Sequence, residues 1–190
     1  MALSARFEQA LAFAAQLHKD QLRKGSQVPY LAHLLGAAGI ALDHGADEDE
    51  AIAALLHDAV EDQGGSPTLE MIRERFGDNV AAIVAGCTDS DAAQKPPWRQ
   101  RKEAYVAHIA KAPASVRLVS AADKLHNARA ILEDYHAQGD ALWSRFSGGR
   151  EGTLWYYRAL VEAFRSAGSL PLVEELDRVV TEIERLAARA

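Results

Sequence analysis

Apolar residues recur at helical spacing along almost the whole chain, and no stretch alternates with period two for long enough to predict a strand. Without a sheet to pack on, amphipathic helices bury their apolar stripes against one another. Glycine and proline pairs such as Gly64-Gly65, Pro96-Pro97 and Gly148-Gly149 divide the pattern into segments. We therefore expect an all-α fold, a bundle of about 8–10 helices.

Capping signals predict where several helices begin. Asp47 followed by Glu50 predicts a capping box, and the helix that it opens should run unbroken to Gly64-Gly65. Thr68 is the expected cap of the next helix, and Ser90 to Trp98 is expected to be a loop. The other predicted helices are one through Ala10 to Leu17, Ala32 to His44, one starting at Asp78, Arg99 to Lys111, Ser115 to Gln138, Trp155 to Ala167 and Pro171 to Ala188.

The chain has the size and composition of one ordinary globular domain. Its 190 residues are 48% hydrophobic and 25% charged, and we find no repeat or linker, so we expect a single domain over residues 1–190. The net charge of −6 argues against a nucleic-acid partner. A phosphorylated small molecule remains compatible, because the basic residues gather in two groups. These groups are Lys19, Arg23 and Lys24, and Lys95, Arg99, Arg101 and Lys102.

The sequence shows no sign of a membrane or secreted protein. No apolar run approaches the roughly 20 residues that a membrane span needs. The segment Ala10 to Ala15 is flanked by polar residues, as in an amphipathic helix rather than a signal peptide. Cys87 is the single cysteine, so no disulfide framework is possible within the chain. We expect a cytoplasmic protein with no membrane partner.

Residues of metal-ligand type stand out at three places: His33, the adjacent pair His57-Asp58, and Asp123. Imidazole and carboxylate groups bind Mn²⁺, Fe²⁺, Zn²⁺ or Mg²⁺. Neighbours on a helix point about 100° apart, so His57 and Asp58 can both reach an ion across one helix edge. His33 and Asp123 would approach from other helices of the bundle. Two imidazoles and two carboxylates would neutralise a dication and leave two octahedral positions for water and substrate.

Two further carboxylates follow this pair at helical spacing. Glu61 lies four residues after His57, and Asp62 lies four residues after Asp58, so each shares a helix face with a candidate ligand. Beside a metal, such carboxylates can activate its water and manage protons near the leaving group. Alternatively, all the acidic residues here form the solvated end of a helix. The flanking apolar residues, which favour burial of the pair and hence a partner for Asp58, are Leu55, Leu56, Ala59 and Val60.

Several short motifs either contain these candidate site residues or lie before and between them along the chain. They are Arg23-Lys24, Pro29 to His33, His57-Asp58-Ala59-Val60-Glu61-Asp62, Thr88-Asp89, Arg101-Lys102 and Ala122 to Asn127. In this combination the chain resembles the HD superfamily of metal-dependent phosphohydrolases. The resemblance is closer to the hydrolase domain of RelA/SpoT proteins and to the small alarmone hydrolases, and it covers Phe13 to Phe164.

The resemblance implies an HD-type helical bundle and an enzyme. The implied reaction removes the 3′-diphosphate of guanosine 3′,5′-bis(diphosphate), or of its 5′-triphosphate analogue, to give GDP or GTP and pyrophosphate. The implied cofactor is one Mn²⁺ ion. Its implied ligands are His33, His57, Asp58 and Asp123, with Glu61 and Asp62 serving the attacking water.

The resemblance also implies a nucleotide pocket. Arg23 and Lys24 would line it, with the planar guanidinium of Arg23 stacked on guanine. Asn127 lies one helical turn after Asp123 and would contact ribose or phosphate. The simpler alternative is that Arg23 and Lys24 form a solvated helix end and that Asn127 has a structural role.

The last third of the sequence departs from the family pattern. Family members place an Arg and, one turn later, a Tyr against the substrate; here Arg150 fits, but Leu154 stands where the Tyr is expected. Tyr157 returns to the same helix face and would replace that ring, or would belong to the core. This departure leaves two alternatives open. One is hydrolysis of another phosphorylated nucleotide, such as a nucleoside monophosphate or NADPH. The other is a non-catalytic nucleotide-binding module, against which the presence of both Glu61 and Asp62 argues.

Overall fold

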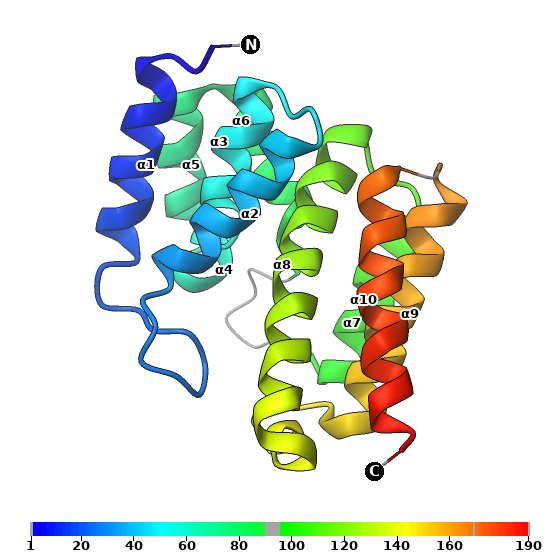
Figure 1. Ribbon diagram of the computed structural model, residues 1–190. Helices are drawn as coiled ribbons and strands as arrows, with labels where there is room; N and C mark the ends of the chain where they lie inside the picture. The colour runs from blue at the N-terminus through cyan, green and yellow to red at the C-terminus, as the bar shows by residue number, and fades with distance from the viewer. Residues whose placement is uncertain (1, 90–95, 169, 190) are drawn as a thin grey trace.

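A computed structural model describes residues 2–89, 96–168 and 170–189 of the chain (Figure 1). As predicted, the described residues are almost entirely helical, and their β-structure is limited to an isolated bridge between Leu22 and Pro29. The helices are α1 (Ala5–Leu17), α2 (Leu31–Asp43), α3 (Glu48–Leu56), α4 (Ala59–Asp62), α5 (Ser66–Phe76), α6 (Asp78–Cys87), α7 (Trp98–Ile109), α8 (Ala114–Gln138), the 3₁₀ helix η1 (Gly139–Arg145), α9 (Gly149–Ser166) and α10 (Pro171–Ala187).

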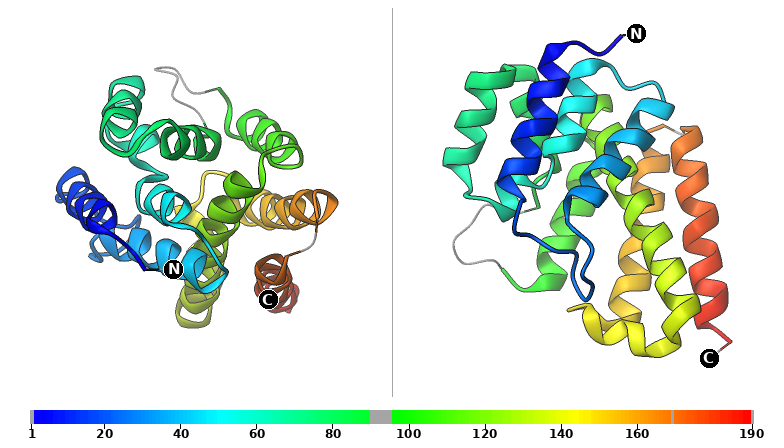
Figure 2. Two further views of the ribbon diagram at one scale, coloured as in Figure 1. Left: turned by 90° about the horizontal axis from the view of Figure 1, so that it is seen from above. Right: turned by 60° about the vertical axis from the view of Figure 1, so that its left-hand side comes forward.

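The long helix α8 runs through the middle of the molecule (Figure 1). It packs against α2, α3 and α6 on one side and against α9 and α10 on the other. Seen from above, the N-terminal helices and the C-terminal pair lie on opposite sides of α8 (Figure 2). Residues on the middle turns of α8 can therefore contact both halves of the molecule.

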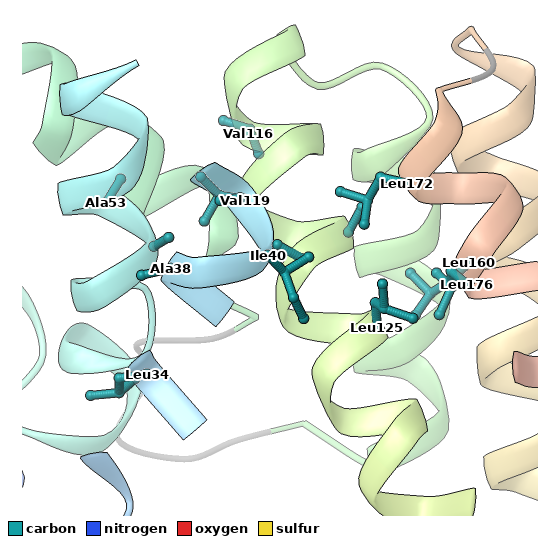
Figure 3. Packing of buried hydrophobic residues seen from close by; sticks show 14 of the residues in the cluster. Leu34, Ala38, Ile40, Ala53, Val116, Val119, Leu125, Leu160, Leu172 and Leu176 are labelled. Carbon is teal, nitrogen blue, oxygen red and sulfur yellow. The ribbon is translucent and has the colours of Figure 1, made fainter. Parts of the chain in front are cut away.

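One contiguous cluster of buried apolar side chains draws on every helix, from Ala10 on α1 to Ala187 on α10. Leu125 of α8 lies between the two halves, facing Leu160 of α9 and Leu176 of α10 (Figure 3). Helix α3 is the most deeply buried element, since all residues from Ala51 to Leu56 are inaccessible to solvent. The motif that follows α3 is therefore anchored in the centre of the core.

The predicted capping box of α3 is confirmed. The Asp47 side chain accepts from the Glu50 amide, and the Glu50 side chain accepts from the Asp47 amide, both at 2.8 Å. The prediction for Thr68 is wrong, because α5 begins two residues earlier, at Ser66. Gly65 turns the chain there with a positive φ of 66°, and the Thr68 hydroxyl donates to the carbonyl of Gln63 instead.

The predicted unbroken helix to Gly64-Gly65 is also wrong, because the helix is interrupted at His57 and Asp58. Helix α3 ends at Leu56, and α4 starts at Ala59. The cause lies in the His57 side chain, whose Nδ1 is 2.8 Å from the carbonyl oxygen of Ala54. In a regular helix that carbonyl would accept from the amide of Asp58, so the side chain competes with the backbone.

Two further boundaries differ from the predictions. Gly148-Gly149 does mark a helix boundary, since η1 ends at Arg145, but α9 begins at Gly149, before the predicted start at Trp155. An ideal Cβ on Gly148 would lie 2.6 Å from the Trp98 ring, so this glycine permits close packing of α7 on the start of α9. Of the predicted loop from Ser90 to Trp98, residues 90–95 lie outside the described residues, and Trp98 is already the first residue of α7. No helix in the described part of the chain is long and apolar enough to cross a membrane.

Candidate active site

The structure brings the four candidate metal ligands together from three helical elements. His33 lies on α2, His57 and Asp58 form the break between α3 and α4, and Asp123 lies on α8. Oδ2 of Asp58 is 2.9 Å from Nε2 of His57 and 3.6 Å from Nε2 of His33. Oδ1 of Asp123 is 3.2 Å from Nε2 of His33 and 3.5 Å from Nε2 of His57. Octahedral ligands about 2.1 Å from an ion lie about 3 Å from their neighbours, so this spacing fits a divalent cation.

The two histidines present unsatisfied nitrogens to this point. Both rings are buried, and neither Nε2 atom has a hydrogen-bond partner among the described residues. Because Nδ1 of His57 donates to the carbonyl of Ala54, the neutral ring that binds a metal would carry its lone pair on Nε2. A buried nitrogen without a partner is costly, and coordination of a cation removes that cost. The donor set therefore fits a divalent metal ion.

The electrostatics of the cluster also favour a cation. Burial alone would lower the pKa of His57, but the carboxylates of Asp58 and Asp123 outweigh it and raise that pKa well above its ordinary value. Burial would raise the pKa of Asp58, but the neighbouring His57 outweighs it and holds that pKa far below its ordinary value. The cluster thus holds two carboxylates ionised and attracts positive charge.

Three neutral or cationic side chains orient the carboxylates. The hydroxyl of Tyr30 donates to Oδ2 of Asp58 at 2.6 Å. The side-chain amide of Asn127 donates to Oδ1 of Asp123 at 2.6 Å, and the ammonium group of Lys124 is paired with the other oxygen of Asp123. Such contacts fix the directions of ligand oxygens around a metal.

A cavity of about 330 Å³ adjoins the cluster. Tyr30, Lys124 and Asn127 line it, so the residues that hold the two carboxylates also form a wall of the cavity. The side chains that give the cavity its positive charge are Arg23, Lys24, Lys102, Lys124 and Arg145. A cationic cavity of this size beside a metal site is suited to a phosphorylated organic molecule.

Most of the predicted substrate residues meet in this cavity. Arg23, Lys24, Asn127 and Tyr157 are among the residues that line it. Arg150 is not: its guanidinium donates to the carbonyl of Ala187 at the end of α10. Among the described residues, Arg150 therefore lies outside the cavity wall, and its contact with the substrate stays a prediction.

Arg145, which sequence reasoning missed, supplies a guanidinium to the cavity from η1. Its Nη1 lies 2.9 Å from Oδ2 of Asp134, another residue of the cavity wall. The one hint of this arrangement in the sequence is the glycine at position 25. The structure gives the reason for it, because an ideal Cβ on Gly25 would lie 2.8 Å from Cδ of Arg145. The glycine lets the loop that carries Arg23 and Lys24 approach Arg145 closely.

The two basic groups of the sequence are divided by the structure. Lys102 lines the cavity with Lys24, whereas the guanidinium of Arg99 lies 3.2 Å from the ring centre of Trp155. Asp89 holds Lys102 in place at 2.6 Å and pairs with Arg101 at the same distance. Lys95 lies outside the described residues.

Glu61 and Asp62 are carried by α4, directly after the break. Neither is among the described residues that line the cavity. Oδ2 of Asp62 accepts a hydrogen bond of 2.8 Å from the Gln21 side chain, whose oxygen lies 2.6 Å from both Nε2 of Gln63 and Nδ1 of His18. Desolvation raises the pKa of Asp62 against the effect of Gln21, and the nearby carboxylates of Asp58 and Glu61 raise it further. A carboxylate with a raised pKa is a better proton acceptor.

Comparison with known proteins agrees with this geometry. The family model described as "HD domain" matches residues 10–154, and the chain therefore belongs to the HD domain family. It is 40% identical over 124 residues to guanosine-3′,5′-bis(diphosphate) 3′-pyrophosphohydrolase MESH1 of Xenopus tropicalis. The matched region covers 64% of this chain and 66% of that protein. The human MESH1 protein is 36% identical over 130 residues, with coverages of 66% and 69%.

The fold is also similar to solved structures. A metazoan orthologue of SpoT, described as hydrolysing ppGpp, superposes with a TM-score of 0.80 at 28% identity, covering 98% of this chain and 99% of the other. A crystal structure from Listeria monocytogenes EGD-e superposes with a TM-score of 0.73 at 29% identity, over 80% of this chain and 99% of the other. The similarity to the first extends over the C-terminal helices as well as the HD motif.

Proposed function

We propose that this protein is a Mn²⁺-dependent hydrolase that removes the 3′-diphosphate of guanosine 3′,5′-bis(diphosphate) or its 5′-triphosphate analogue, giving GDP or GTP and pyrophosphate. The observation that carries the proposal is the wall shared by the ligand cluster and the cationic cavity, formed by Tyr30, Lys124 and Asn127. A nucleotide in the cavity has its phosphates beside these residues. The activity named for the MESH1 relatives and for the SpoT orthologue supports the choice of substrate.

The metal is held by two imidazoles and two carboxylates in this proposal. The ligands are His33, His57, Asp58 and Asp123. A mixed set of imidazole and carboxylate ligands would be able to hold Mn²⁺. When bound, the ion supplies an activated water and neutralises charge on the phosphate.

Glu61 and Asp62 manage the proton of the attacking water. Both follow the ligand pair on α4, and the amide of Gln21 fixes the direction of Asp62. The raised pKa of Asp62 favours its acceptance of a proton at neutral pH. The pair thus divides two tasks, in which one carboxylate orients the water and the other accepts its proton.

The cavity positions the nucleotide in this scheme. Arg23 stacks on guanine, and Tyr157 provides an aromatic wall in place of the ring expected at Leu154. Lys24, Lys102 and Arg145 attract the phosphates from three separate elements of the fold. Arg145 replaces Arg150 as the guanidinium contributed from the C-terminal third. We also propose a cytoplasmic location and one folding unit over residues 1–190, supported by the single cysteine and the contiguous core.

A product assay on a nucleotide panel tests the proposal. The panel is guanosine 3′,5′-bis(diphosphate), its 5′-triphosphate analogue, GMP and NADPH, each with and without Mn²⁺. We expect pyrophosphate release from the first two only, and only with the metal. Release of inorganic phosphate from GMP or NADPH would favour the second candidate, a nucleotide phosphatase, to which the substitution at Leu154 points. Nucleotide binding without turnover of any substrate would indicate a non-catalytic module.

A further inference from the structure

One side chain contacts both the metal cluster and a substrate residue. His126 lies on α8, three residues after Asp123, and its Nδ1 is 2.9 Å from Nδ1 of His33. The same Nδ1 is 3.3 Å from Nη1 of Arg23, whose Nη2 donates to Oδ1 of Asn127 at 3.0 Å. A single nitrogen atom is therefore shared by a candidate metal ligand and a candidate nucleotide-binding residue.

The hydrogen-bonding capacities of Arg23, His126 and His33 determine which ring nitrogen carries a proton. A guanidinium can only donate, so Nδ1 of His126 carries its lone pair and no proton, and that one lone pair is shared between the 3.3 Å contact with Arg23 and the 2.9 Å contact with His33. The proton between the two Nδ1 atoms then belongs to His33, which donates it to His126. With its proton on Nδ1, neutral His33 has a lone pair on Nε2, the atom that faces the two carboxylates. The opposite assignment would leave Arg23 directed at an N–H group.

We propose that His126 is a positioning residue that couples the metal site to the nucleotide cavity. By accepting from His33, it fixes the tautomer and ring orientation in which His33 can bind a metal. By accepting from Arg23, it holds the guanidinium at the cavity wall. The proposal rests on the metal site of the proposed function and adds to it a residue that touches neither metal nor substrate.

Gly36 supports this role from the neighbouring helix. It follows His33 by one turn on α2, and any Cβ at this position would overlap the His126 imidazole. The site therefore includes a space on α2 that admits the His126 ring beside His33. A glycine inside a helix is less favourable than alanine, and here it makes room for the ring.

Metal affinity measured by calorimetry with Mn²⁺ alone tests the proposal. His126→Asn keeps an acceptor close to the position of Nδ1, whereas His126→Leu keeps similar volume and removes the acceptor. Loss of such a second partner of a ligating histidine typically costs 10- to 100-fold in metal affinity. We expect His126→Leu to lose Mn²⁺ affinity by about that factor and to have a raised KM. His126→Asn should lose much less Mn²⁺ affinity. His136→Leu, at an exposed position of the same helix, is the matched control and should bind metal as the wild type does.

A second variant moves the ring without removing any hydrogen-bonding group. Gly36→Ala should displace His126 and lower Mn²⁺ affinity in the same direction as His126→Leu. Adding Gly36→Ala to His126→Asn should cost little more, because the smaller side chain no longer meets the new methyl group. Arg23→Ala, in contrast, should raise KM and leave Mn²⁺ affinity nearly unchanged, since the acceptor of His33 remains.

The outcomes separate this inference from the proposed function. If wild-type protein binds no Mn²⁺, the proposed metal site fails. If the wild type and His126→Leu bind Mn²⁺ equally, only the role of His126 is overturned. Equal losses in His126→Asn and His126→Leu, with equally lowered melting temperatures, would also overturn it, because ring packing rather than proton acceptance would then be responsible.

Discussion

Charged and titratable side chains gather in two regions of this molecule under opposite conditions. Between α9 and α10, Arg158 and Arg165 pair with three carboxylates at a partly exposed surface. At the metal cluster, the imidazoles are buried and their Nε2 atoms have no hydrogen-bond partner in the described structure. Exposed pairs contribute little each, whereas buried groups without partners are destabilising. The comparison shows that the region where polar groups are least satisfied is the one arranged for a ligand.

Substitution of a metal-ligating residue in the buried region should have the largest effect on metal binding and turnover. We expect Asp58→Ala and His57→Ala to abolish metal binding and turnover, because four protein ligands leave none to spare. Elemental analysis of the purified variants and the product assay measure both effects. Full metal occupancy in Asp58→Ala would contradict the assignment of this ligand. The control is Asp177→Ala, in the network of surface ion pairs between α9 and α10, which should retain both metal binding and turnover.

Glu61→Gln separates chemistry from binding within the buried region. Gln keeps the shape of Glu61 and cannot accept a proton, so fold and metal content should be retained. If Glu61 is the member of the pair that accepts the proton, turnover should fall by roughly 10²- to 10⁴-fold. Steady-state kinetics with metal analysis on the same sample measures this. Turnover close to that of the wild type would make Asp62 the sole candidate base.

The affinity of the buried site for a metal ion should depend on pH. The pKa of His57 is raised well above its ordinary value of 6.5, so its ring is protonated in the metal-free protein near neutral pH. Metal binding requires the neutral ring and must displace this proton. Affinity should therefore increase with pH, by up to about tenfold per unit, and level off once the pH exceeds that pKa. Calorimetry in two buffers of different ionisation enthalpy counts the released proton; a pH-independent affinity would contradict the prediction.

Arg23 offers a test of specificity at the cavity. A stacked guanidinium contributes roughly 0.5–2 kcal/mol, so Arg23→Ala should weaken substrate binding about 2- to 30-fold. Arg23→Lys should not rescue it fully, because an ammonium group has no plane to stack and cannot make both contacts with His126 and Asn127. The KM at two salt concentrations is the measurement. Full rescue by Lys, with a loss that fades in salt, would reduce Arg23 to a simple charge.

The smallest effect is expected in the surface network. Arg158 contacts Asp177 and Glu184 but remains partly exposed. Its replacement by Ala should lower the free energy of unfolding by about 1 kcal/mol or less, since solvent screens such pairs. Denaturant titration measures the change, and turnover should be unaffected. A loss of several kcal/mol would mean that this network, too, is integral to the fold.

The sequence predicted well those features that depend on local spacing. Helical periodicity identified the long helix α8 within one residue of its start, and the Asp47–Glu50 pair fixed the start of α3. The residue types at His33, His57-Asp58 and Asp123 identified the candidate ligands, because few other combinations suit a dication. These inferences needed no knowledge of how the helices pack.

Features that depend on contacts between distant segments were missed. Gly148 lies at a helix boundary as predicted, but its packing against the Trp98 ring of α7 could not be read from the sequence. Arg150 had the expected position in the sequence, but the end of α10 takes its guanidinium, and Arg145 enters the cavity instead. Gly36 gave no signal at all until α8 placed His126 against it. In each case the decisive partner lies on another element.

The break between α3 and α4 limits how this protein can be engineered for heat resistance. Replacing poor helix formers and straightening interrupted helices is a common route to a higher melting temperature. Here a helix continuous from Glu48 to Asp62 would direct the Asp58 amide at the carbonyl of Ala54, which His57 now uses. The gain in helix stability would disturb the imidazole orientation on which the metal site depends. A stabilising library should therefore leave residues 54–58 unchanged and diversify the exposed face of α10 instead.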